Sequence, residues 1–386
     1  MKKEIQKFLK FLYLASSEES FYFDENINFN LFYNISVKNR VSNILFYGIQ
    51  NNKSENFVID DKLKSKMQLD CLNFGIKSVK QGQVFSQIVE LFKKENIDLI
   101  AFKGIELQNL FIKPEMRVMG DIDFIVSSKD YIKAKNLLIN VLNFDAITET
   151  HDELCLINQE KIAVELHQHL ATELSNNQKY FDLEYKKNLI EKNNYFTFNN
   201  KFHFVYMMDH IYKHFVDGGL GLKYILDFAL YIKKYPNILQ DSLPDLKKLK
   251  LYNLTIAFLQ ICEQYLGIDI SAYGSIFEKN ISDKSIETLI INILKYGEYG
   301  TIESRVRAKD AQGTFLKRVI KRIFPPFYRE ERKNLFFEIL IYPIRMFRWF
   351  FYFLRNTGYI KNVLKSKQNI TDEEKQRLIN MYNELK

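Results

Sequence analysis

Cysteine is scarce in this chain. Its 386 residues include three cysteines, Cys71, Cys155 and Cys262. An odd number of widely spaced cysteines provides neither a disulfide framework nor the paired ligands of a zinc motif. We therefore expect the protein to fold in a reducing environment, in the cytoplasm.

The N-terminal stretch lacks the uninterrupted apolar core of a signal peptide. It begins with basic residues, but Glu4, Lys7 and Lys10 interrupt the apolar side chains that follow. This pattern predicts an amphipathic helix at the start of the chain and not a secretory leader.

Long apolar runs are also rare, and residues 335–354 are the membrane candidate. Glu338, Arg345 and Arg348 lie inside this run and Pro343 interrupts it. A lone membrane-spanning helix disfavours such residues. We expect a helix that is buried or that lies on a surface.

The basic charge is concentrated in one segment. The whole chain has 55 Lys and Arg against 47 Asp and Glu, and fifteen of the basic residues lie between residues 301 and 365 with five acidic ones. A local excess of this kind reflects the partner of that segment. Three interpretations stay open: a solvated helical face, RNA binding, or peripheral contact of residues 316–360 with an anionic membrane at the inner face.

The length of the chain allows more than one hydrophobic core. Its pattern predicts an N-terminal helical region at 1–80, an α/β core at 81–187, a helical domain at 188–300 and a basic, aromatic-rich helical region at 301–386. No internal repeat or low-complexity tract interrupts these regions. The oligomeric state stays open.

The spacing of apolar residues predicts the individual elements. Strands are expected at 98–102, 121–126, 154–158 and 162–167, with helices at 81–96, 105–111 and 128–142. Further helices are expected at 3–14, 41–49, 204–215, 222–231, 246–266 and 283–296, while 68–79 has a less regular pattern. Gly218, Gly219 and Gly221 are badly spaced for a nucleotide-binding loop and predict a turn.

An acidic doublet on a predicted strand is the most informative motif. In Gly120-Asp121-Ile122-Asp123-Phe124 two carboxylates alternate with apolar residues. On a strand both therefore leave the same face, about 6.8 Å apart along the backbone. Chance supplies about six acidic-x-acidic pairs in such a chain, mostly at solvated strand edges. This pair stands out because it lies inside the second strand of a β-α-β order.

Two carboxylates on one strand form half of a site for Mg²⁺ or Mn²⁺, because hard cations prefer oxygen ligands. Glu165 lies between apolar residues on a later predicted strand and is the candidate third ligand beside Asp121 and Asp123. Three carboxylates facing one way would repel one another strongly without a cation. The alternative is that Glu165 ends a solvated hairpin.

Several further motifs accompany the acidic doublet at 120–126. They are Lys103-Gly104, Arg117, 164–167, His210 with His214, 222–227 and 322–326. Together these motifs resemble the uncharacterised nucleotidyltransferase family of the polymerase-β-like superfamily, which combines a Lys-Gly turn, an Arg and an Asp-hydrophobic-Asp strand with later His-containing and Asp-containing elements and a Phe-Pro segment. The likeness spans about residues 85–360.

The resemblance implies an α+β fold in which a small mixed-sheet nucleotidyltransferase core is flanked by N-terminal and C-terminal helical regions. It also implies a Mg²⁺-dependent (or Mn²⁺-dependent) enzyme that binds ATP or another NTP. Such an enzyme moves an NMP to a hydroxyl or phosphate acceptor and releases pyrophosphate. The acceptor stays open among a small molecule, a polysaccharide precursor, RNA and a protein.

The resemblance also implies roles for individual residues. Asp121 and Asp123 would bind both metal ions, and Glu165 would bind one ion and orient or deprotonate the acceptor. Lys103 would contact triphosphate oxygens, and the Gly104 turn would offer backbone N–H groups to them.

Arg117 is a second candidate for binding phosphate, with a salt bridge to a local acid such as Glu115 as the alternative.

Two positions depart from the family pattern. Glu165 replaces the usual Asp and can still bind a metal ion, whereas Lys223 replaces an Arg and lacks its bidentate fork.

All six histidines lie between residues 151 and 214. His167 shares a strand face with Glu165, where it would orient a ligand or the acceptor, or serve a structural role. His210 and His214 are four residues apart on one helix, but zinc would need a third ligand, and Ile211 stands where a metalloprotease has Glu. The alternatives for this pair are closing a pocket between two domains and packing near Asp227.

Two other functions remain open. The first is a glycosyltransferase whose Asp-x-Asp motif binds Mn²⁺ and a nucleotide sugar. The helical pattern before the motif argues against it, because a sugar-nucleotide domain should begin there. The second is a catalytically inactive nucleotidyltransferase fold that serves as a binding module.

Overall fold

The structure is a computed structural model, and it describes residues 2–54, 59–171, 177–276, 280–313, 347 and 370–386. The chain forms two compact units. One comprises Met1–Lys213 with Gly221–Asn280, and the other comprises His214–Leu220 with Ile281–Lys386. The four regions predicted from the sequence stay a prediction.

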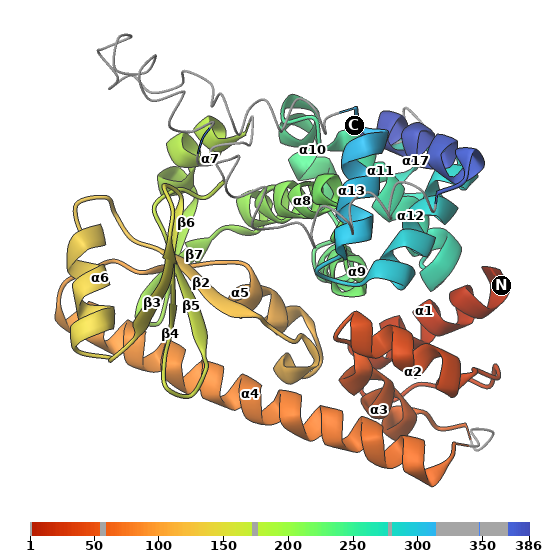
Figure 1. Cartoon of the computed structure of the whole chain (residues 1–386), viewed down its shortest axis with the longest axis horizontal. Coiled ribbons are helices and arrows are strands. Elements are labelled where there is room, and N and C mark those ends of the chain that lie inside the picture. Colours follow the sequence, from red (N-terminus) through yellow and green to blue (C-terminus); the bar gives the residue numbers. More distant parts are fainter. Residues whose placement is uncertain (1, 55–58, 172–176, 277–279, 314–346, 348–369) are drawn as a thin grey trace. The chain divides into compact units, whose positions relative to one another are not determined.

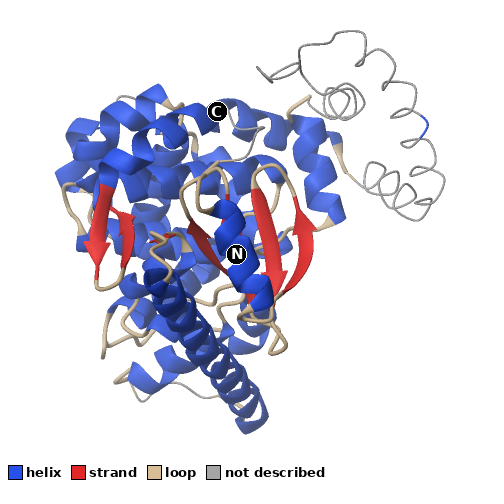
Figure 2. Cartoon of the chain, turned by 90° about the vertical axis from the view of Figure 1, so that its left-hand side faces the viewer, coloured by secondary structure: helices blue, strands red, loops and turns tan. Residues whose placement is uncertain are grey.

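The first unit is built on a seven-stranded mixed sheet with the strand order β3-β4-β5-β2-β1-β7-β6 (Figure 1). β2 runs parallel to β5 and β1 parallel to β7, while the other neighbours are antiparallel. Helices surround these strands (Figure 2), which confirms the predicted α+β fold. The strands are β1 (Ile100–Ala101), β2 (Asp121–Ile125), β3 (Asp145–Glu149), β4 (Glu153–Ile157), β5 (Ala163–His167), β6 (Leu189–Lys192) and β7 (Tyr195–Phe198).

One face of the sheet forms the hydrophobic core with α4 (Asp61–Lys94) and α6 (Tyr131–Asn140). Ile122 and Phe124 of β2 are fully buried there, and the ring of Phe124 meets the edge of Phe92 from α4 at 5.9 Å. Replacing a buried Phe of this kind with Ala costs about 3–5 kcal/mol. Because side chains alternate along a strand, this burial turns Asp121 and Asp123 to the opposite face.

The opposite face is covered by aromatic side chains of α7 (Gln178–Glu184) and α8 (Asn200–Asp217). Tyr206 of α8 contacts the ring of Phe102 at 5.4 Å and that of Phe181 at 5.3 Å. Phe102 in turn packs against the ring of His167 at 5.1 Å. The carboxylates of β2 therefore lie on a face that α8 partly shields from water.

The N-terminal helices are α1 (Lys2–Ser17), α2 (Phe29–Lys38) and α3 (Ser42–Asn51), which confirms the two helices predicted before residue 50. α4 is one continuous helix of 34 residues where the sequence predicted a helix at 81–96 and left 68–79 unclear. Its first half is helical because Leu63, Met67 and Cys71 are buried along one side, and burial of one helix face outweighs weak local periodicity.

Several predicted elements differ from the structure. β1 has two residues, and β3 was not predicted because it is exposed along its whole length and lacks apolar alternation. β6 and β7 were missed as well. The single helix expected at 246–266 is divided into α10 (Ile238–Lys248) and α11 (Tyr252–Ile261). Lys250 has a φ of 59° between them, and a positive φ cannot continue a right-handed helix.

The second unit contains α12 (Asp283–Tyr296), α13 (Ile302–Ala311) and α17 (Asp372–Leu385). α12 has the bounds predicted from the sequence. Gly218 has a φ of +74°, and a Cβ atom at this position would lie 2.7 Å from the carbonyl oxygen of Ser304. This turn therefore requires glycine.

The predicted membrane-contact segment at 316–360 and the apolar run at 335–354 lie outside the described residues, apart from Phe347. In the described part of the chain, no helix has the length and apolar character needed to cross a membrane. The three cysteines are free.

Candidate metal centre

The candidate site is built on the parallel pair β2 and β5. Their register sets Asp123 directly beside Glu165, Asp121 beside Ala163, and Ile125 beside His167. Because paired residues in a ladder share a face, the side chains of Asp121, Asp123, Glu165 and His167 all leave the side opposite the core. The structure thus places the three carboxylates that the sequence singled out on one face of the sheet, together with His167.

Three of these side chains form a tight cluster. One ligand atom each of Asp123, Glu165 and His167 lies within 4.8 Å of the others. His167 Nε2 is 3.0 Å from Asp123 Oδ1 and 3.4 Å from Glu165 Oε2. Asp123 and His167 are each 3% exposed. Asp121 lies two residues earlier on β2 and outside this cluster.

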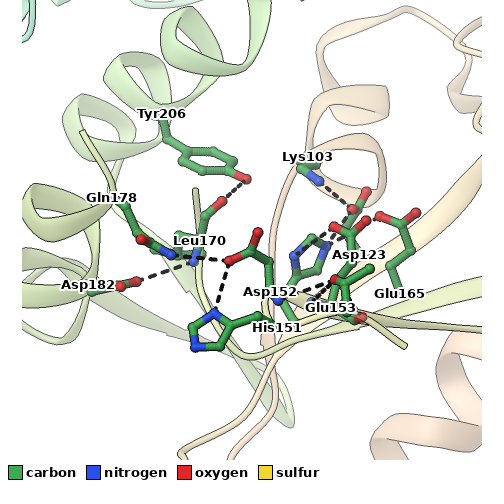
Figure 3. A network of polar contacts seen from close by, with 12 residues as sticks. Lys103, Asp123, His151, Asp152, Glu153, Glu165, Leu170, Gln178, Asp182 and Tyr206 are labelled. Atoms are coloured by element: carbon green, nitrogen blue, oxygen red, sulfur yellow. Dashed lines mark hydrogen bonds and ion pairs between the residues drawn. The ribbon is translucent and has the colours of Figure 1, made fainter. Parts of the chain in front are cut away.

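Lys103 provides the nearby positive charge. Its Nζ atom lies 2.6 Å from Asp123 Oδ1 (Figure 3). The residue precedes the short helix α5 (Gly104–Leu107) and has φ 55° and ψ −125°. This conformation lies outside the small left-handed region that side-chain-bearing residues tolerate, and costs about 1–3 kcal/mol. Backbone strain of this kind is concentrated at active sites and ligand clamps.

The pKa values show how charge is distributed over this face. Burial, together with the charges of Asp123 and Glu165, raises the pKa of Asp121 to about 7. Burial also acts against the charged form of Asp123, but the Lys103 ammonium and the His167 ring hold the pKa of Asp123 below its usual range.

The pKa values of the two basic groups, Lys103 and His167, are both raised. Burial acts to lower the pKa of Lys103, but the charge of Asp123 raises it well above its ordinary value. Burial and the Lys103 charge act to lower the pKa of His167, but its hydrogen bonds to Asp123 and Glu165 raise it. At Asp121, burial and the two neighbouring carboxylates outweigh the charges of Lys103 and Lys223. The donor set therefore fits a divalent cation.

Gly104 allows a close approach of two loops. A Cβ atom at this position would lie 2.9 Å from Met119 Sδ and 3.2 Å from Arg117 Nη1. Glycine therefore lets the turn after Lys103 pack against the segment that leads into β2. This packing brings Lys103 to Asp123.

Arg117 has a partner that neither sequence interpretation named. Its Nε and Nη2 atoms donate to the two carboxylate oxygens of Asp227 at 2.7 and 2.8 Å, and the pair is buried. Asp227 lies on α9 (Leu222–Lys234). Glu115, the acid considered as a partner, accepts a hydrogen bond from Tyr47. The bidentate pair with Asp227 fixes the segment before β2.

Sequence reasoning missed several polar groups beside the cluster. Glu153 of β4 pairs in register with His167, and its Oε2 atom lies 3.7 Å from His167 Nδ1. The rings of His151 and His169 stack at 4.9 Å, and His169 Nδ1 lies 2.8 Å from Asp182. The antiparallel hairpin register is the signal that could have placed Glu153 on this face.

The remaining residues singled out from the sequence are Lys223, His210 and His214. Lys223, at the position where the family has Arg, lies close enough to Asp121 for its charge to lower the pKa of that carboxyl. His210 packs against Tyr224 at 5.9 Å. Among the described residues, the cluster with metal-binding geometry is that of Asp123, Glu165 and His167, so His210 and His214 are not brought into such a group.

Comparison with known proteins identifies the family of this chain. No curated protein and no solved structure matches the chain. A sequence model of the uncharacterised nucleotidyltransferase family matches residues 25–267. This match covers more than half of the chain and contains the whole mixed sheet, and the chain therefore belongs to the uncharacterised nucleotidyltransferase family.

Proposed function

We propose that this protein transfers an NMP from an NTP to a hydroxyl or phosphate acceptor and releases pyrophosphate. The observation that carries the proposal is the cluster of Asp123 and Glu165 beside Asp121 and Lys103, in a chain of the nucleotidyltransferase family. Such an arrangement supplies both anionic metal ligands and a cation for phosphate oxygens.

Asp121, Asp123 and Glu165 are the residues that would hold Mg²⁺ or Mn²⁺. When bound, the ions would lower the pKa of an attacking hydroxyl and neutralise charge on the leaving pyrophosphate. The fit rests on geometry: ligand atoms of Asp123, Glu165 and His167 lie within 4.8 Å of one another, and Asp121 lies on the same face of β2.

Lys103 and Lys223 supply the charges for the triphosphate. The Lys103 ammonium lies against Asp123 in this structure and would contact phosphate oxygens when an NTP binds. The Gly104 turn keeps Lys103 close to β2. We assign Arg117 a positioning role in place of phosphate binding, because Asp227 engages its guanidinium.

Glu165 is suited to handling the acceptor, because its side chain is 20% exposed while that of Asp123 is 5% exposed. The acceptor oxygen would form a bond to the α-phosphorus as the bond between that phosphorus and the bridging oxygen breaks. The proton of the acceptor would pass to Glu165. Pyrophosphate leaves with the electron pair of the broken bond.

The proposal is tested by incubating the purified chain with each α-labelled NTP, with Mg²⁺ or Mn²⁺, and with fractions of cell extract. We expect one NTP to label one class of acceptor, and Asp123→Asn to lower this transfer by at least about 1,000-fold. Asp145→Asn on the exposed strand β3 is the matched control and should retain activity.

Three outcomes would contradict the proposal. Undiminished transfer by Asp123→Asn would show that the cluster is not the active site. Transfer of sugar from labelled UDP-sugars would favour a glycosyltransferase. The absence of any metal-dependent thermal shift with every NTP would favour an inactive binding module.

We further infer a cytoplasmic location, which is supported by the free cysteines. The hydroxyl or phosphate nature of the acceptor is proposed from the sequence resemblance. The contact of residues 316–360 with an anionic membrane surface is likewise proposed from the sequence.

A further inference from the structure

The cluster on β2 and β5 is not purely carboxylate. Its members are the carboxylates of Asp123 and Glu165 and the imidazole of His167. The Nε2 atom of His167 faces both carboxylates, at 3.0 Å from Asp123 and 3.4 Å from Glu165. An imidazole nitrogen and two carboxylate oxygens thus converge on one point, and Asp121 stands outside this group.

The second ring nitrogen of His167 faces another carboxylate. His167 Nδ1 lies 3.7 Å from Glu153 Oε2, and the β4–β5 register places the two residues side by side. Histidines that bind metal ions almost always direct their other ring nitrogen to a carboxylate, a carbonyl or water, which fixes the tautomer and the ring orientation. Nε2 donates a hydrogen bond to Asp123 in this structure. An ion bound at Nε2 would replace that proton, and the remaining ring proton would lie on Nδ1, toward Glu153.

The ring of His167 is also held in place from the side. It packs against Phe102 at 5.1 Å and is 3% exposed. A fixed and buried imidazole beside two carboxylates is prepared for binding an ion, because little side-chain entropy remains to be lost.

We propose that His167 is a metal ligand through Nε2 and that this nitrogen gives the site a preference for divalent transition-metal ions over Mg²⁺. The proposal rests on the proposed function in taking the cluster as a cation site. Oxygen-only ligand sets suit Mg²⁺, whereas imidazole favours the first-row transition metals. Glu153 is the positioning residue, because it acts on the ion through His167.

The first test is pulsed electron paramagnetic resonance of the full chain loaded with Mn²⁺ alone. We expect the spectrum to show coupling to an imidazole ¹⁴N nucleus, and to change to the ¹⁵N pattern when the protein is made with ¹⁵N-histidine. His167→Gln should lose the coupling. His169→Gln is the matched control and should keep the coupling. His169 lies two residues after the end of β5 and pairs with Asp182.

The wild-type protein made with ¹⁵N-histidine is sufficient for this test even if His167→Gln fails to fold. Mn²⁺ binding without histidine-nitrogen coupling would overturn the proposal and leave the proposed function standing. Coupling that persists in a folded His167→Gln variant would overturn it as well. Failure to bind Mn²⁺ or Mg²⁺ with or without NTP would instead overturn the metal-dependent function itself, and this proposal with it.

The second test compares the dissociation constants of Mn²⁺ and Mg²⁺ by calorimetry. His167→Asp replaces the nitrogen ligand with an oxygen ligand. We expect it to lower the ratio of the Mg²⁺ dissociation constant to the Mn²⁺ dissociation constant at least about tenfold. Glu153→Gln should weaken Mn²⁺ binding by about 10–100-fold and keep the nitrogen coupling. An unchanged ratio in His167→Asp would contradict the proposed selectivity.

Discussion

At the scale of single residues, Lys103 has the most unusual combination of backbone and charge in the site. Its backbone is strained at φ 55° and ψ −125°, and its ammonium lies 2.6 Å from a carboxylate that the metal ion would also need. If the proposed function holds, the same side chain would compete with the cation for Asp123 before nucleotide binding and would contact the phosphates afterwards.

Lys103→Met should strengthen Mn²⁺ binding to the nucleotide-free protein by about tenfold and weaken NTP binding. The reason is that removing the ammonium frees Asp123 for the ion but leaves the phosphates without a counter-charge. Calorimetric titration with each ligand measures both effects. Lys135→Met, which breaks the ion pair with Glu149 at the edge of the sheet, should change neither, and weaker Mn²⁺ binding by Lys103→Met would refute the competition.

The buried pair of Arg117 and Asp227 gives a second prediction at this scale. Asp227→Asn leaves the guanidinium without its counter-charge and should lower the free energy of unfolding by about 3–5 kcal/mol. Glu373→Gln, which breaks the exposed i,i+4 pair with Arg377, should cost about 0.5 kcal/mol or less. Urea denaturation compares the two variants, and equal losses would show that the buried pair contributes no more than a surface pair.

At the scale of single elements, α8 carries two buried groups with opposite responses to pH. Burial lowers the pKa of His203 to about 3, so between pH 3 and 6.5 the unfolded chain binds a proton that the folded chain does not. Burial raises the pKa of Asp209 to about 6, so between pH 4 and 6 the folded chain holds a proton that the unfolded chain lacks. Stability therefore rises with pH through His203 and falls with pH through Asp209.

Between pH 4 and 6 these two effects nearly cancel in the wild type, and single variants should separate them. Over this range the stability of His203→Phe should fall by about 3 kcal/mol relative to the wild type, and that of Asp209→Asn should rise by about 3 kcal/mol. Urea denaturation at both pH values measures the slopes. The double variant should follow the wild type, and parallel slopes in all four proteins would contradict the two pKa shifts.

The elements also show what the sequence could and could not predict. Alternation along 121–126 and 162–167 placed Asp121, Asp123 and Glu165 on strands, because a strand with one buried face has a fixed side-chain period. The partnership of Arg117 with Asp227 was not predictable, because 110 residues separate the two in sequence. The position of Glu153 beside His167 depends on the hairpin register. β3 was not predicted because it is exposed along its length, and the strand predicted at 98–102 is shorter in the structure, where β1 has two residues.

At the scale of the whole molecule, the basic charge is the feature with the clearest experimental consequence. Residues 301–365 carry fifteen basic and five acidic side chains. We expect the chain to sediment with vesicles that contain anionic lipid and to be released as salt is raised, because each basic residue near such a surface contributes about 1 kcal/mol.

Replacing Arg345, Arg348 and Arg355 with Gln should weaken this binding by about 100-fold. Replacing the exposed Lys62, Lys64 and Lys66 of α4 with Gln is the control, because these residues lie outside residues 301–365. Equal binding to neutral vesicles, or no binding to anionic ones, would exclude an electrostatic membrane contact.

The buried pair of Arg117 and Asp227 also has a consequence for how the site comes into being. The segment that leads into β2 is anchored by a residue that the ribosome adds 110 positions later, after the sheet itself has been synthesised. A nascent or truncated chain that ends before α9 contains every proposed metal ligand but leaves a guanidinium without its counter-charge beside them. The site should therefore mature only once α9 has docked, and the shortest active fragment should extend beyond residue 227.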